Sequence, residues 1–75
     1  MTFGKQTRVL RENAGIKAVA LAERVGLTPT QLSARETDAV SMTKVEFMGI
    51  VSALRSMADD LGVALGDVDF SGEED

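Results

Sequence analysis

The sequence predicts an all-α domain of four to five short helices. Apolar residues recur at helical spacing, glycines follow the periodic segments, and two of these segments begin with Thr-x-x-Gln or Thr-x-x-Glu. No two segments show the alternating pattern of paired strands, so we expect no sheet.

The composition describes one small domain. With 75 residues, the chain leaves little room for an active site beneath a buried core. It has no cysteine and no histidine, which excludes disulfides and most zinc sites. No signal peptide and no apolar run of about 18 residues is present, so we expect a cytoplasmic protein without membrane contact. Small domains often gain stability from a second copy, which makes a homodimer our expectation.

Charge is distributed unevenly along the sequence. Residues 1–35 carry six basic and two acidic side chains, a net charge of +4. Residues 36–75 carry ten acidic and two basic side chains, a net charge of −8. We therefore divide the chain into a domain over residues 1–66 and an acidic tail over residues 67–75, which favours solubility.

Two helices are expected in the first third of the chain. The first covers residues 3–14 and ends before Gly15, and the second covers residues 18–25 and ends before Gly26. Glycine is the usual residue just past a helix, because it adopts the left-handed conformation without strain. The apolar side of the second helix is formed by Val19, Leu21, Ala22 and Val25.

A third helix is expected over residues 29–36. Thr28 supplies the N-terminal cap, Pro29 occupies a position where a missing N–H costs nothing, and Gln31 closes a capping box. The connecting segment that follows covers residues 37–43.

The fourth helix is opened by a second capping box, Thr43 with Glu46, and is ended by Gly62. Its periodic apolar residues are Phe47, Ile50, Val51, Leu54, Met57, Ala58 and Leu61. A break near residue 55 into two shorter helices is the alternative. Beyond it, Val63, Leu65, Val68 and Phe70 are expected to fold back onto the core or across to a partner.

This fourth helix has more apolar residues than one small core needs. We expect Phe47, Ile50, Leu54 and Leu61 to face inward. Val45, Met48 and Val51, or Val63, Leu65 and Phe70, are then left over for a two-fold dimer interface.

The second and third helices are joined by only three residues, Gly26-Leu27-Thr28, as in a helix-turn-helix unit. The small Ala22 lets the two helices approach closely. The wedge between them is expected to be filled by Leu21, Val25, Leu27 and Leu32. The polar side of the third helix must then face outward.

Residues 4 to about 66 resemble the Cro and phage-repressor (XRE-type) helix-turn-helix family, which has a lambda-repressor-like fold. The matching residues are Leu10-Arg11-Glu12 with Gly15, Leu21-Ala22-Glu23-Arg24-Val25-Gly26-Leu27, Leu32-Ser33 with Glu36, and Ala58 with Leu61-Gly62-Val63. The resemblance implies a largely structural ion pair between Arg11 and Glu36.

The resemblance also implies a function. The chain would be a sequence-specific, double-stranded DNA-binding transcriptional regulator, a homodimeric repressor of phage or mobile-element type that binds a palindromic operator. A second regulatory protein is a further possible partner. No cofactor, metal or catalytic residue is expected.

The third helix would enter the major groove, with Thr30 and Gln31 as its main contacts. Lys17 and Lys44 begin the second and fourth helices, where they either bind phosphate or are ordinary surface lysines. Arg35 either contacts DNA or pairs with Asp38 or Glu12. The full set of candidate DNA-binding residues is Lys17, Thr28, Thr30, Gln31, Ser33, Ala34, Arg35 and Lys44.

The chain departs from the family pattern at several positions. Pro29 and Ala34 stand where base-reading residues are usual, so Ala34 can offer only a methyl contact, for example to thymine. Arg35 replaces a commonly apolar residue, and Asp38 replaces a usual glycine. The segment before Ala58 is also longer than the family norm by roughly two helical turns.

These departures favour an alternative function. The chain could be a protein-binding antitoxin or antiactivator that keeps the helix-turn-helix fold without reading DNA. An enzyme is not expected, because the chain lacks His and Cys and its carboxylates pair locally or lie in the tail. Residues 67–72 resemble the start of an EF-hand calcium loop, but the chain ends before the required glutamate.

Overall fold

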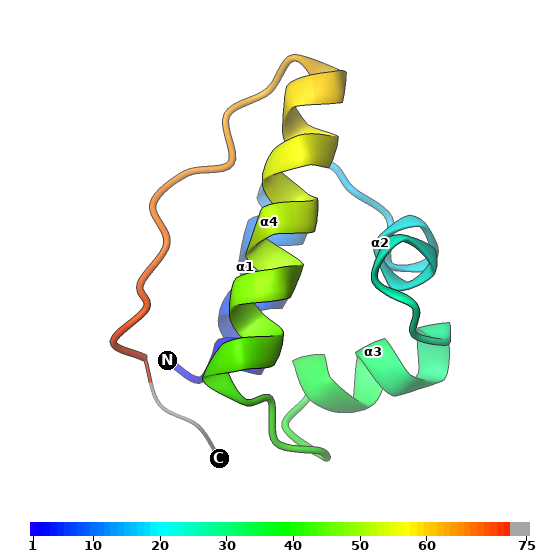
Figure 1. The fold of residues 1–75 in the computed structure, drawn as a ribbon, viewed down its shortest axis with the longest axis vertical. Coiled ribbons are helices and arrows are strands. Elements are labelled where there is room, and N and C mark those ends of the chain that lie inside the picture. Colours follow the sequence, from blue (N-terminus) through cyan, green and yellow to red (C-terminus); the bar gives the residue numbers. More distant parts are fainter. Residues whose placement is uncertain (73–75) are drawn as a thin grey trace.

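The computed structural model describes residues 1–72 and contains four helices. These are α1 (Phe3–Asn13), α2 (Ala18–Val25), α3 (Pro29–Glu36) and α4 (Lys44–Leu61). No strand occurs among the described residues, so the all-α prediction is confirmed. Helices α1 and α4 lie side by side, and α2 and α3 lie on one side of this pair (Figure 1).

The glycines end the helices as expected. Gly26 and Gly62 have φ angles of 77° and 71°, in the left-handed region that glycine adopts without strain. Helix α1 ends one residue earlier than expected, with Ala14 as its C-terminal cap before Gly15. Capping residues thus predicted the helix ends to within one position.

Helix α4 is continuous over its 18 residues, so the alternative break near residue 55 is absent. Its start is fixed by the capping box. Thr43 Oγ1 accepts a hydrogen bond from the N–H of Glu46 at 3.1 Å, and Glu46 Oε1 accepts one from the N–H of Thr43 at 3.2 Å. Two otherwise unpaired N–H groups of the helix start are thereby satisfied.

The core is formed where α4 packs against α1 and α2, with Leu32 contributed by α3. The rings of Phe3 and Phe47 are stacked with centroids 4.6 Å apart. The buried face of α4 consists of Phe47, Ile50, Val51, Leu54 and Ala58.

Two assignments on α4 were wrong. Val51 is only 1% exposed and belongs to the core, because it lies on the same helix face as the buried Phe47 and Leu54, at spacings of four and three residues. Leu61 was expected inward but is 58% exposed. Leu61 is the last residue of α4, and it lines an open pocket together with Ala20 and Arg24 of α2 instead of packing into the core.

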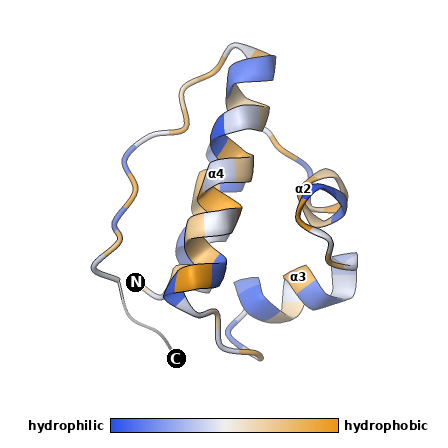
Figure 2. Ribbon diagram, in the orientation of Figure 1, coloured by the Kyte–Doolittle hydropathy of each residue, from blue (hydrophilic) through white to orange (hydrophobic). Residues whose placement is uncertain are grey.

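The segment after α4 folds back onto the core of its own chain. It runs along the side of α4 opposite to α2 and α3, and it alternates between hydrophobic and hydrophilic residues (Figure 2). Leu65, Val68 and Phe70 pack against the core, and the Phe70 ring meets Phe47 edge-on at 5.7 Å. Val63 remains 41% exposed. The part of the predicted acidic tail over residues 67–72 therefore lies against the domain, and residues 73–75 lie outside the described residues.

Among residues 1–72, no helix combines the length and the apolar composition required to cross a bilayer.

Candidate nucleic-acid interface

The reversal between α2 and α3 is made by Gly26 and Leu27. Gly26 is left-handed, and the N–H of Leu27 donates to the carbonyl of Ala22 at 2.8 Å, which closes the end of α2. Leu27 then packs against the core. This turn sends α3 away at a steep angle to α2 (Figure 1).

The wedge between α2 and α3 is tightly closed. Leu21, Ala22 and Leu32 are completely buried, and Val25 and Leu27 pack against them from the edge. These are the residues expected to fill it. Because Ala22 has no exposed surface, a larger side chain there would force the two helices apart.

The start of α3 is fixed by the predicted capping box. Thr28 Oγ1 accepts from the N–H of Gln31 at 3.1 Å, and Gln31 Oε1 accepts from the N–H of Thr28 at 2.9 Å. The side-chain oxygen of Gln31 is therefore occupied, and its amide NH₂ group retains two donors. In this conformation, the NH₂ group of Gln31 can donate to an acceptor on a base edge.

The outward face of α3 is small and polar. Pro29, Thr30, Gln31 and Ser33 are exposed, and Ala34 is half-buried. The hydroxyl groups and the Gln31 amide are thus available to an external partner, and no bulky side chain blocks their approach.

The other end of α3 is fastened to α1 by the expected ion pair. Arg11 Nε and Nη2 donate to the two carboxylate oxygens of Glu36, each at 2.9 Å, and Nη1 donates to the Ile16 carbonyl at 3.1 Å. Both side chains are largely buried. The hydrogen bond to Glu36 raises the pKa of Arg11, so the guanidinium stays charged. The pair holds α1, the α1–α2 connection and α3 in one arrangement.

Arg35 has a partner that sequence reasoning missed. Its Nε donates to Glu46 Oε2 at 3.0 Å and its Nη1 donates to the Gln31 carbonyl at 3.0 Å. A backbone hydrogen bond from Thr43, followed by the bond from Arg35, holds the pKa of Glu46 below its usual value. In the sequence, Glu46 was explained by its capping role alone, and eleven positions separate it from Arg35.

Asp38 occupies the position where the resemblance places glycine. Its φ angle of 64° is in the left-handed region, which aspartate tolerates better than most residues. Its carboxylate accepts from Thr2 Oγ1 at 2.8 Å and lies 3.4 Å from Lys5 Nζ. The side chain that replaces glycine thus ties the α3–α4 connection to the start of α1.

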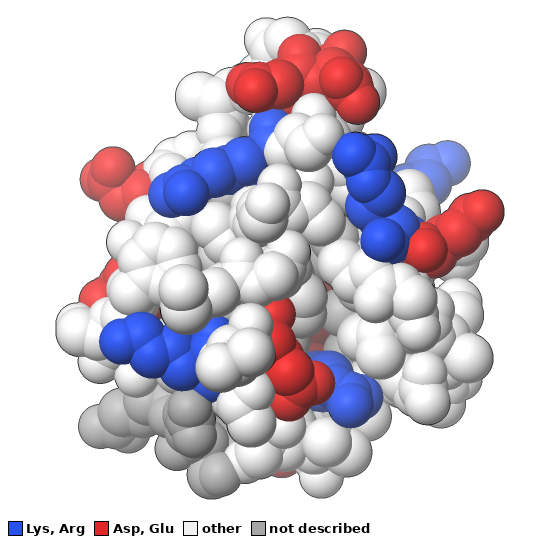
Figure 3. All heavy atoms as spheres, in the orientation of Figure 1, with Lys and Arg blue, Asp and Glu red and all other residues white. Residues whose placement is uncertain are grey.

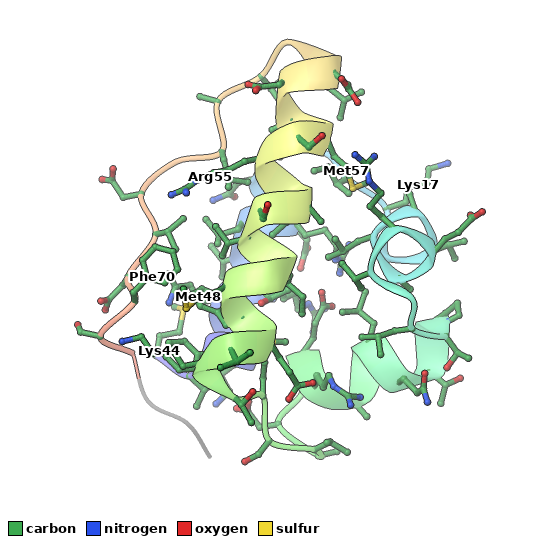
Figure 4. The ribbon with its side chains drawn as sticks, viewed as in Figure 1. Lys17, Lys44, Met48, Arg55, Met57 and Phe70 are labelled. Atoms are coloured by element: carbon green, nitrogen blue, oxygen red, sulfur yellow. The ribbon has the colours of Figure 1, made fainter. Side chains whose placement is uncertain are left out.

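The two candidate lysines lie far apart. Lys17 is exposed at the N-terminal cap of α2, whose first turn has no side-chain cap. Lys44 is also exposed, but it lies on the side of α4 that faces Phe70 of the C-terminal segment. Lys17 lies on the opposite side of α4 (Figure 4). The structure therefore brings Thr28, Thr30, Gln31, Ser33, Ala34 and Arg35 together on α3, and leaves Lys44 on another face.

Folding pairs part of the uneven charge of the sequence. Three ion pairs, Lys5–Asp38, Arg11–Glu36 and Arg35–Glu46, each join a cation of the basic half to a carboxylate of the acidic half. Acidic and basic groups are interspersed over the face that carries α4 (Figure 3). The net positive charge of residues 1–35 therefore forms no strong basic patch on this face.

Within residues 1–72, no three metal-binding side chains are gathered in one place. Comparison of the chain with models of protein families, with curated proteins and with solved structures found no match.

Proposed function

We propose that this chain is a sequence-specific binder of double-stranded DNA, a homodimeric transcriptional repressor of phage or mobile-element type, in which α2 and α3 form an XRE-type helix-turn-helix. The observation that carries the proposal is the exposed polar start of α3 on a rigid support. Thr30, Gln31 and Ser33 are exposed, while Leu32 beneath them is completely buried. A short polar helix face on a rigid support is what reading bases in a major groove requires.

The proposed contacts follow from the available atoms. The Thr30 hydroxyl and the Gln31 amide NH₂ would meet acceptors on base edges, and the Ala34 methyl would meet a thymine methyl. The free N–H groups at the start of α2, together with Lys17, would hold a backbone phosphate. Arg11 and Glu36 stay within the scaffold.

Dimerisation would place two copies of α3 about 34 Å apart, one turn of a palindromic operator. The apolar side chains of Val45 and Met48, which are 80% and 54% exposed, are available for a partner copy. Bound across a promoter, such a dimer would exclude polymerase or another regulator.

A mobility-shift assay tests the proposal, with the region upstream of the protein's own gene as the duplex. Gln31→Glu is the sharpest variant, because glutamate preserves the capping box and places a negative charge against the DNA. We expect it to abolish the shift and Thr30→Ala to weaken it, with unchanged folding. Ala64→Glu adds the same charge at an exposed site beyond α4 and should bind like the parent protein. An equal loss of DNA binding in Gln31→Glu and Ala64→Glu would contradict the reading of bases by α3.

A second candidate is a protein-binding antitoxin or antiactivator. It is favoured by the ion pair that occupies Arg35 and by the groove between α2 and α4, which is lined by Val25, Leu27, Ile50 and Ala53 with the exposed Val45 at its edge. Absence of a shift at low salt, together with a stable heterocomplex in a pull-down, would support this candidate over the first.

A further inference from the structure

The only basic side chain of α3 is held by a carboxylate of another helix. Arg35 lies on α3 and Glu46 in the first turn of α4, and their Nε and Oε2 atoms are 3.0 Å apart. We propose that Glu46 is a positioning residue that limits the affinity and the salt dependence of the proposed DNA binding, because it withholds Arg35 from phosphates. This inference rests on the proposed function.

Arg35 is held at three points. Its carbonyl lies against α1 at Gly4, where an added Cβ would be 1.9 Å from the Arg35 oxygen. Its Nη1 donates to the Gln31 carbonyl, and its Nε donates to Glu46. The side chain is only 19% exposed, so little of its charge faces solvent.

Glu46 is equally well fixed, because its two carboxylate oxygens have different partners. Oε1 accepts from the N–H of Thr43, and Oε2 accepts from Arg35. The capping box therefore fixes the rotamer in which Glu46 meets Arg35. A carboxylate already oriented for other reasons binds the guanidinium without further loss of side-chain entropy.

The consequence for DNA binding is electrostatic. Non-specific affinity comes almost entirely from cations that neutralise phosphates, whereas base contacts add specificity. With Arg35 neutralised, α3 offers the hydrogen-bonding groups of Thr30 and Gln31 without a net attraction to phosphate. Glu46 thus lowers the affinity for any duplex by a similar factor, because a phosphate contact does not depend on the base sequence.

Glu46→Gln tests this directly. Glutamine serves in a capping box as glutamate does, so the variant removes the charge and keeps the helix start. Binding is measured by fluorescence anisotropy with the upstream duplex and with a scrambled duplex, from 50 to 200 mM salt. One added phosphate contact should steepen the slope of log K against log salt by about 0.9, or about threefold more loss over this range. We expect tighter binding to both duplexes, by similar factors.

Three further variants make the test specific. Asp59→Asn changes the net charge equally at the far end of α4, and its salt slope should match that of the parent protein. Arg35→Gln alone should also leave the slope unchanged, and Arg35→Gln combined with Glu46→Gln should remove the gain of the single Glu46 variant.

Two results for the slope of log K against log salt overturn the inference: no change in Glu46→Gln, or an equal change in Asp59→Asn. A slope shallower by about one in Arg35→Gln also overturns it, because that would show that Arg35 already contacts phosphate in the parent protein. The salt slope of Arg35→Gln still tests whether Arg35 contacts phosphate, even if Glu46→Gln does not fold. Failure of the proposed function is a different result: the parent protein then binds neither duplex at the lowest salt, and the inference fails with it.

Discussion

The side chain of Gln6 pairs with the backbone of Asp69 as a neighbouring strand would. Gln6 Nε2 donates to the Asp69 carbonyl at 2.9 Å, and the Asp69 N–H donates to Gln6 Oε1 at 2.6 Å, across 63 positions of sequence. Gln6 is 6% exposed, so these two hydrogen bonds satisfy both the buried side-chain amide and the backbone of the extended segment. The pair holds Val68 and Phe70 on the aromatic cluster of Phe3 and Phe47.

Gln6→Ala should therefore destabilise the domain. It leaves the Asp69 N–H and carbonyl without their partner, which we expect to reduce the free energy of unfolding by about 1–2 kcal/mol. Urea denaturation measures this. Asp69→Ala is the matched control, because the backbone pair survives it and only the bonds that Asp69 Oδ1 accepts from the Ser71 N–H and hydroxyl are lost. A larger effect from Asp69→Ala than from Gln6→Ala would contradict this account.

The helix ends could be predicted because local chemistry determines them. Thr28 with Gln31 and Thr43 with Glu46 satisfy N–H groups within one turn, and Gly26 supplies a left-handed angle that depends on no distant residue. The burial of Leu21, Ala22 and Leu32 could be predicted for a similar reason, because a three-residue connection leaves two adjacent helices few ways to pack.

The missed features depend on distant parts of the chain. The Arg35–Glu46 pair depends on the path of residues 37–43, which no periodicity specifies. The exposure of Leu61 depends on how closely α2 approaches the last turn of α4, although Leu61 continues the apolar stripe in sequence. The sequence left open whether Phe70 packs on its own core or on a partner. The pairing of Gln6 with Asp69 favours the first alternative, and a single buried glutamine gives no pattern in the sequence.

Gly4 and Gly49 should respond oppositely to alanine. A Cβ on Gly4 would lie 1.9 Å from the Arg35 carbonyl, so Gly4→Ala must push α1 and α3 apart, at a cost of roughly 1–3 kcal/mol. A Cβ on Gly49 meets no atom within 4 Å, so Gly49→Ala should stabilise α4 by up to about 1 kcal/mol. Thermal melts of both variants decide the point. The close contact of α1 with α3 is refuted if Gly4→Ala melts at or above the parent temperature.

Glu36→Gln should be among the most destabilising single changes in the chain. It leaves the largely buried charge of Arg11 with a neutral partner, and breaking a buried pair costs about 3–5 kcal/mol when burial is complete. We expect about 2–4 kcal/mol here, since Arg11 retains its bond to the Ile16 carbonyl. The exposed pair Arg8–Glu12 is the control: Glu12→Gln should change stability by less than about 0.5 kcal/mol. Similar losses of stability in Glu36→Gln and Glu12→Gln would show that the Arg11–Glu36 pair has no special role in fixing α3.

The stabilisation from Glu46 should disappear in acid. The Thr43 N–H and Arg35 lower the pKa of Glu46 in the folded protein, so the folded state binds its proton less readily than the unfolded chain does. The contribution is therefore complete above the ordinary glutamate pKa of about 4.3 and is lost as pH falls through the lowered value. Because Glu46 is 36% exposed, we expect no more than about 1 kcal/mol. Urea denaturation of the parent protein and Glu46→Gln at several pH values should show a gap that is constant between pH of about 5 and 7 and closes below about 4. A gap that widens on acidification would mean that Glu46 is stabilised in its protonated form, which the hydrogen bonds from Thr43 and Arg35 do not allow.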